Sequence, residues 1–173
     1  VWQKIRNQAG DHALTDAARG TAAGYLQTED TNVETGNDND GVSAFLSDGF
    51  TAKGGFNSDT NTWVTWLWDA GTSAATPSSS YNITPTDQWI NTTAGFSITG
   101  YTGNGSDDQT LPHGLNAKPD FVIIKNRDNA DGSWVTKHSS LSSGKVLFLD
   151  STSAEGDSSY GEIKDLDSNV TVT

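Results

Sequence analysis

An apolar run that reads as a β-strand occurs twice in the chain, and this repetition constrains the fold more than any other feature. The clearer copy, residues 121–127, reads FVIIKNR, and the degraded copy, residues 1–7, reads VWQKIRN. Lys125 lies 121 residues after Lys4, and Arg127 lies 121 residues after Arg6. A fixed interval of this kind indicates copies of one structural module. The sequence therefore predicts parts of two related modules.

The likeness continues downstream at nearly the same interval. Residues 24–31 correspond to 145–152, and residues 45–51 correspond to 165–171. The first module lacks the motifs that precede residue 121, and the second lacks a counterpart of the Trp-rich segment 62–68. We therefore expect a chain that begins inside one copy and ends inside the next, as a processed product or a fragment of a longer polypeptide would.

Incomplete modules suggest that strands are exchanged between them. One half of the chain would complete the other, or a neighbouring copy would donate the missing strand, as in β-strand addition. This hypothesis predicts that Thr62–Trp68 pairs outside its own module.

The composition favours short strands joined by tight turns. The chain has 18 glycines and many Ser, Thr, Asn and Asp residues, which supply the dihedral angles of hairpin turns. We predict an all-β fold of two related antiparallel β-sandwich modules of the jelly-roll type. Residues 1–71 form the first module, and residues 96–173 form the second. Residues 72–95, with Pro77, Pro85 and a run of three serines, have the low hydrophobicity of a linker.

The Trp-rich segment Thr62–Trp68 has no polar face. Alternation places Trp63, Thr65 and Leu67 on one side and Val64, Trp66 and Trp68 on the other, which predicts a central strand covered on both sides. Tryptophans that reach the surface also stack on sugars, so Trp63, Trp66 and Trp68 are candidate ligand-binding residues. A glycan-binding groove would be lined by two or more of Trp2, Trp63, Trp66, Trp68, Trp89 and Trp134.

The charge of the chain excludes some partners. A net charge of −12 and a pI near 4.3 repel nucleic acid and anionic membrane surfaces. No apolar run approaches the roughly 18 residues of a membrane span, so we expect no membrane insertion. The chain has no cysteine, which rules out disulfides and thiol chemistry.

Metal-binding and catalytic patterns are weak. Residues 37–41 read NDNDG and imitate the alternating oxygen ligands of a calcium loop, which makes Asp38 and Asp40 candidate calcium ligands, but the distal bidentate Glu is missing. His12, His113 and His138 lack zinc spacing, and strand alternation separates His138 from Ser139. His113 is interpreted as a turn residue whose ring bonds to a backbone group. We identify no catalytic constellation and no cofactor motif.

Several segments resemble a module that is repeated in long structural and tail-fibre-like proteins of marine bacteriophages, where it often stands beside laminin-G-like lectin domains. The resemblance implies a virion structural protein, and it covers most of the chain outside the linker. The segments that carry it are FSITGYTGNG (96–105), PHGLNAKPDFVIIKNR (112–127), WVTKHSS (134–140), KVLFLDST (145–152), DAARG (16–20), SDGFT (47–51) and TWVTWLWDAG (62–71).

The sequence thus predicts a non-enzymatic structural module of a virion or extracellular fibre. It would act by self-association with copies of itself or with other fibre proteins, and also by surface attachment, since a fold repeated along a chain needs only its neighbours. The alternative is a glycan-binding, lectin-like module with calcium dependence. A host-surface glycan would then be its partner.

Overall fold

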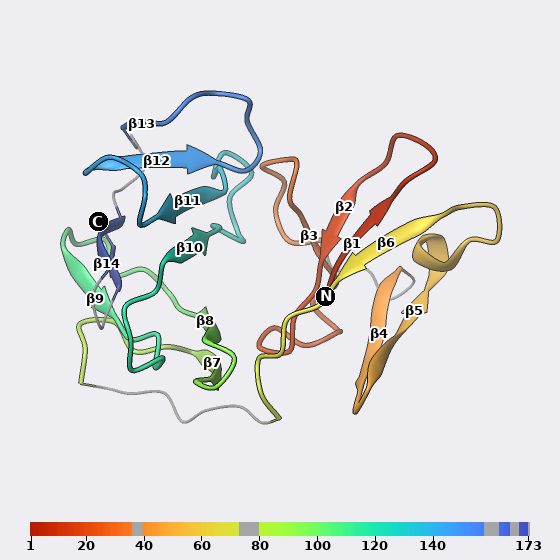
Figure 1. The fold of residues 1–173 in the computed structure, drawn as a ribbon, viewed down its shortest axis with the longest axis horizontal. Coiled ribbons are helices and arrows are strands. Elements are labelled where there is room, and N and C mark those ends of the chain that lie inside the picture. Colours follow the sequence, from red (N-terminus) through yellow and green to blue (C-terminus); the bar gives the residue numbers. More distant parts are fainter. Residues whose placement is uncertain (36–39, 73–79, 158–162, 167–169, 173) are drawn as a thin grey trace. The chain divides into compact units, whose positions relative to one another are not determined.

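The computed structural model describes residues 1–35, 40–72, 80–157, 163–166 and 170–172. The fold is all-β and sandwich-like, and all its strand pairs are antiparallel, as the sequence predicts (Figure 1). The chain divides into two compact units. Unit 1 comprises Val1–Trp68 with Asn126–Ser133, and unit 2 comprises Asp69–Lys125 with Trp134–Thr173. No helix in the described part of the chain is long and apolar enough to span a membrane.

Unit 1 contains a four-stranded sheet in the order β3-β2-β1-β6 and a separate hairpin, β4-β5, followed by a 3₁₀ turn, η1. Its buried apolar side chains are Ile5, Ala13, Leu26, Val42 and Phe56. The elements are β1 (Trp2–Ile5), β2 (His12–Leu14), β3 (Leu26–Gln27), β4 (Gly41–Leu46), β5 (Gly49–Lys53), η1 (Gly54–Asn57) and β6 (Trp63–Trp66).

Unit 2 contains a four-stranded sheet in the order β10-β11-β12-β13, a three-stranded sheet in the order β14-β15-β9, and the hairpin β7-β8. Trp134 and Val146 are almost fully buried, together with Ile83 and Leu111. The strands are β7 (Asp87–Asn91), β8 (Phe96–Gly100), β9 (Gln109–Leu111), β10 (Phe121–Ile124), β11 (Val135–His138), β12 (Lys145–Phe148), β13 (Gly156–Asp157), β14 (Ile163–Leu166) and β15 (Val170–Val172).

The two units divide the chain differently from the predicted domains. The predicted linker, residues 72–95, contains β7, and the second half of the chain returns residues 126–133 to unit 1. Sequence reasoning missed β7 because its fully buried residue is polar. Gln88 is 3% exposed, and its side-chain amide donates to Thr99 Oγ1 and to the Pro112 carbonyl at 3.1 and 2.8 Å. A satisfied buried amide hides the apolar alternation of a strand.

The position and pairing of β6 contradict two of the predictions made from the sequence. It pairs with β1 of its own unit, with Trp2 opposite Trp66 and Ile5 opposite Trp63, so the expectation that Thr62–Trp68 pairs outside its module is wrong. The Arg6 N–H donates to the Thr62 carbonyl at 2.8 Å, which extends this pairing. β6 is also an edge strand rather than a central one. Its outward residue Trp66 packs against Trp2 of β1, with ring centroids 5.6 Å apart, and is still 46% exposed.

A network of charged side chains joins residues 126–133 to the rest of unit 1. The Arg19 side chain, only 6% exposed, donates to Asp16 Oδ2, to the Leu14 carbonyl and to Glu34. Arg127 donates to the other carboxylate oxygen of Glu34, and the Glu34 N–H donates to the Arg127 carbonyl at 2.9 Å. Two guanidinium groups thus share one carboxylate.

Candidate functional site

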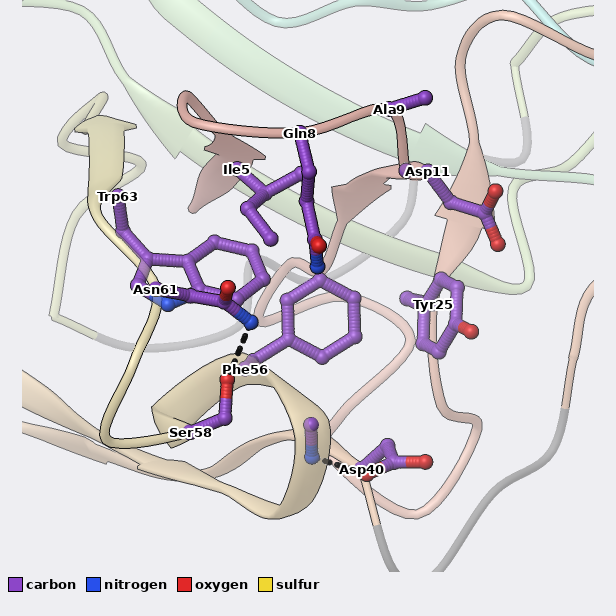
Figure 2. Close-up of a pocket in the computed structure, with 12 residues that line it drawn as sticks. Ile5, Gln8, Ala9, Asp11, Tyr25, Asp40, Phe56, Ser58, Asn61 and Trp63 are labelled. Carbon is purple, nitrogen blue, oxygen red and sulfur yellow. Dashed lines mark hydrogen bonds between the residues drawn. The ribbon is translucent and has the colours of Figure 1, made fainter.

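A cavity of about 290 Å³ lies in unit 1, between the loop after β1 and the turn η1 (Figure 2). The loop contributes residues 8–11, η1 and the turn after it contribute Gly55, Phe56, Ser58 and Asn61, and β6 begins the opposite wall with Trp63. Ile5 at the end of β1, Tyr25 just before β3 and Asp40 just before β4 complete the lining. Four separate segments of the chain therefore converge on this cavity.

Three aromatic rings form a continuous wall of the cavity. The Tyr25 and Phe56 rings meet edge to face with centroids 5.2 Å apart, and Phe56 and Trp63 are tilted at the same distance. Register explains the position of Trp63, because its partner Ile5 is buried on the same face of the sheet. Gly54 begins η1 with a φ of +62°, which lets the chain turn sharply and point Phe56 inward. Aromatic walls of this kind stack on apolar faces of ligands.

Polar groups surround this wall. Figure 2 shows the side chains of Gln8 and Asn61 among the rings, and Asn61 Nδ2 donates to Ser58 Oγ at 2.5 Å. The Asp40 carboxylate accepts the Gly55 N–H at 2.5 Å, which holds η1 against the start of β4. Trp63 Nε1 is buried and has no hydrogen-bond partner. The lining thus combines stacking surface with amide and carboxylate groups, the usual make-up of a small-molecule site.

The electrostatic potential at the cavity is negative. Burial raises the pKa of the Tyr25 phenol above its ordinary value, and the nearby carboxylates of Asp11, Asp40 and Glu29 raise it further. Negative charges disfavour the phenolate because it would be a like charge. The same negative potential favours a neutral or cationic ligand over an anion.

The candidate tryptophans fall on two sides of the sheet. Trp63 belongs to the cavity, whereas Trp66 and Trp68 gather around Trp2 on the opposite face, with Trp2 and Trp68 stacked at 6.1 Å. The Trp2 indole N–H donates to Thr28 Oγ1 at 3.1 Å, which fixes the ring. Trp66 and Trp68 are each 46% exposed, and Leu67 is 60% exposed. We call Trp2, Trp66 and Trp68 the tryptophan cluster.

Of the two candidate calcium ligands, only Asp40 lies among the described residues. Asp38 lies outside the described residues, and Asp40 is the cavity residue that binds the Gly55 N–H. Within the described ranges no three His, Asp or Glu side chains form a group that could hold a metal ion.

The histidines occupy turns and strand ends. His113 Nδ1 accepts the Leu115 N–H at 3.1 Å, which confirms the prediction of a turn residue bonded to the backbone. His138 is exposed, its Nδ1 accepts the Ser140 N–H, and its ring packs against Phe121 at 6.2 Å.

Sequence reasoning missed most of the cavity. Gln8, Phe56 and Asn61 lie in loops and turns that carry no motif, and the repeated segment that contains Tyr25 gives no sign of a binding role. The one available signal was the glycine pair at 54 and 55 beside a single aromatic residue, which is typical of a tight turn that buries its ring.

Unit 2 exposes a second apolar surface. The pairs Ile123–Thr136 and Thr136–Leu147 place these three side chains in one row across β10, β11 and β12. Phe121 lies on the same face as Ile123, two residues earlier. We call the exposed side chains Phe121, Ile123, Leu147 and Leu149 the β10–β12 apolar face; they are 53%, 37%, 36% and 37% exposed.

Comparisons with known proteins give one match. No curated protein and no solved structure matches the chain. The family model described as "Domain of unknown function (DUF7483)" matches residues 1–173, and the chain therefore belongs to that family.

Proposed function

We propose that the chain is a non-enzymatic structural module of a virion or extracellular fibre, and that it acts by associating with copies of itself or with other fibre proteins. The observation that carries the proposal is that each unit leaves large apolar side chains exposed. Unit 1 exposes Trp66, Leu67 and Trp68, and unit 2 exposes the β10–β12 apolar face. Groups of large exposed apolar side chains are typical of interaction surfaces.

The repeated topology supports the same proposal. In unit 1, β1, β2 and β3 are neighbours in one antiparallel sheet, and in unit 2 the strands β10, β11 and β12 have the same order. The hairpin β4-β5 likewise corresponds to β14-β15 at the interval of about 120 residues. A module repeated along a chain suits an extended assembly, because each copy contacts only its neighbours.

Sedimentation of the whole chain tests the proposal. We expect the average mass to rise with protein concentration and to rise further at high salt, because copies with a charge of −12 repel one another until salt screens them.

The double substitution Trp66→Lys and Trp68→Lys is expected to weaken association about tenfold or more, since exposed tryptophans dominate such contacts. Val33→Lys is the matched control, because Val33 is 41% exposed and lies outside both apolar surfaces. A monomer at every concentration and salt would contradict self-association.

The cavity favours a second candidate function, a glycan-binding module. Its three rings could stack on a sugar face, and the Gln8 and Asn61 amides with Asp11 could bond to hydroxyl groups. This candidate requires Trp63 and not the tryptophan cluster.

A glycan array followed by calorimetry tests the second candidate. We expect neutral or amino sugars to bind, Tyr25→Ala to weaken binding about tenfold through loss of ring stacking, and Trp66→Ala to leave it unchanged. A calcium titration in parallel tests the predicted calcium dependence. Binding that Trp66→Ala abolishes and Tyr25→Ala leaves intact would move the site to the tryptophan cluster. No response to any sugar would eliminate this function.

A further inference from the structure

The aromatic rings that line the cavity of unit 1 differ in orientation. The planes of the Tyr25 and Phe56 rings stand at 71° to each other, and the Trp63 ring is tilted by 44° from Phe56, with centroids 5.2 Å apart in both pairs. Because the planes are not parallel, one group in the cavity can meet more than one ring. The face of an aromatic ring attracts a cation that lies within about 6 Å of its centroid.

The charged side chains of the lining are acidic. Among the described residues that line the cavity, Asp11 and Asp40 carry negative charge, and none is a lysine, arginine or histidine. Lys4 is not part of the lining, and its Nζ donates to the Gly10 carbonyl at 2.9 Å. The lining therefore offers a cation both ring surface and negative charge, and it presents no positive side chain that would repel one.

The Tyr25 phenol reports the sign of the potential beside the rings. Burial raises its pKa most, and the carboxylate of Asp11 raises it further, followed by those of Asp40 and Glu29. The Glu29 carboxylate is fixed nearby, because both its oxygens accept the His12 N–H at 3.0 Å. Figure 2 shows the Tyr25 ring between Asp11 and Asp40. Charges that disfavour a phenolate stabilise a cation at the same place.

The lining suits a cation whose charge is spread over methyl groups. A primary ammonium is compact and strongly hydrated, and needs several acceptors directed at it, whereas a methylated ammonium contacts ring faces through its methyl groups. Polar groups of the lining already bond within the protein, since the Asn61 amide donates to Ser58 and Asp40 accepts the Gly55 N–H. Residues 8–11 are exposed, so the carrier of the ammonium can extend into solvent.

We propose that the cavity of unit 1 binds a methylated ammonium group, with the rings of Tyr25, Phe56 and Trp63 around the cation and the Asp11 carboxylate beside it. The carrier is either a free small molecule of the choline type or a trimethylated lysine side chain of another protein. This ammonium site uses the same cavity as the glycan-binding candidate. It rests neither on that candidate nor on self-association.

The test compares choline with the neutral alcohol in which a carbon atom replaces the choline nitrogen. Both ligands have the same shape and apolar surface, so only the charge differs. Ligand-observed NMR titration of the whole chain at neutral pH gives the two affinities, and we expect choline to bind about fivefold more tightly or better. A short peptide with one trimethyllysine, against its unmethylated form, is the second arm. The tighter of choline and the methylated peptide identifies the carrier.

Substitutions separate the contribution of the rings from that of the charge. Tyr25→Leu is expected to weaken choline binding about tenfold, and Tyr25→Phe, which keeps the ring, to change it less than about twofold. Asp11→Asn is expected to weaken binding about threefold through loss of one nearby charge. Asp48→Asn is its matched control, because Asp48 is exposed in the β4–β5 turn outside the lining. The Asp11 and Asp48 pair decides the outcome should Tyr25→Leu unfold.

Several results would overturn the ammonium site. Choline and the neutral alcohol would bind equally, or neither would bind. An equal loss in Asp11→Asn and Asp48→Asn would indicate general attraction to an acidic chain. A loss in Trp66→Leu that Tyr25→Leu does not share would place binding at the tryptophan cluster. The glycan array and sedimentation are read separately, so a chain that ignores choline but binds sugars or self-associates loses this site alone.

Discussion

Replacing Arg19 with alanine is expected to lower the free energy of unfolding of unit 1 by about 3–5 kcal/mol. The Arg19 side chain is 6% exposed and serves three acceptors, Asp16, Glu34 and the Leu14 carbonyl. Its loss leaves two carboxylates, each less than 15% exposed, near one another without their shared cation. An uncompensated buried charge costs far more than an exposed ion pair contributes.

Urea unfolding followed by tryptophan fluorescence measures this loss. Arg6→Ala is the matched control, because the Arg6 side chain is exposed, and it should change stability by less than about 0.5 kcal/mol. Arg127→Ala should fall between the two, since its side chain is 41% exposed and Glu34 keeps Arg19. Equal stability of Arg19→Ala and Arg6→Ala would show that the network contributes nothing to unit 1.

Gly114→Ala is expected to destabilise unit 2 by about 2–4 kcal/mol, through backbone strain and overpacking together. Gly114 has a φ of +73°, and a Cβ there would lie 2.2 Å from Ile90 Cδ1 and 3.1 Å from Ile90 Cγ1. Both the positive φ and the neighbouring Ile90 side chain therefore require a glycine at position 114. This explains the Pro-His-Gly-Leu motif, in which the His113 ring accepts the Leu115 N–H across the glycine.

A second glycine separates the two causes. Gly105 has the same φ of +73°, and a Cβ there would meet nothing within 4 Å, so Gly105→Ala should cost only the backbone share, about 1–2 kcal/mol. Ile90→Val removes the methyl group at 2.2 Å and keeps Cγ1 at 3.1 Å, so in that background most of the extra cost of Gly114→Ala over Gly105→Ala should disappear. Thermal unfolding of the four variants gives these differences. If Gly114→Ala costs as little as Gly105→Ala in the native background, Ile90 moves aside freely.

Repetition and strand patterns were the parts of the fold that the sequence predicted well. The run at 121–127 contains β10, and the run at 1–7 contains β1. Residues 121–124 are uniformly apolar, so their pattern alone identifies a strand, whereas residues 1–7 are identified by their likeness to 121–127. The match between 45–51 and 165–171 likewise corresponds to two antiparallel hairpins.

The candidate site could not be predicted in the same way. Tyr25, Phe56 and Trp63 meet through long-range turns, and no local period relates them. The Trp-rich segment was misinterpreted as central because aromatic residues on both faces normally indicate burial. Here one face lines a cavity, and the other packs only in part against Trp2, which leaves Trp66 46% exposed. Which neighbour covers an aromatic ring is decided by tertiary packing and not by the segment itself.

The discontinuity of unit 1 has a consequence for the order in which the chain matures during synthesis. Residues 126–133 leave the ribosome long after β1 to β6, yet they carry the second guanidinium group on Glu34 and the carbonyl that accepts its N–H. Until Arg127 emerges, the nascent amino-terminal half keeps Glu34 bonded to Arg19 alone. Domains usually fold as continuous units from the amino terminus during translation. In this chain, completion of the amino-terminal unit waits for a loop encoded within the carboxy-terminal half.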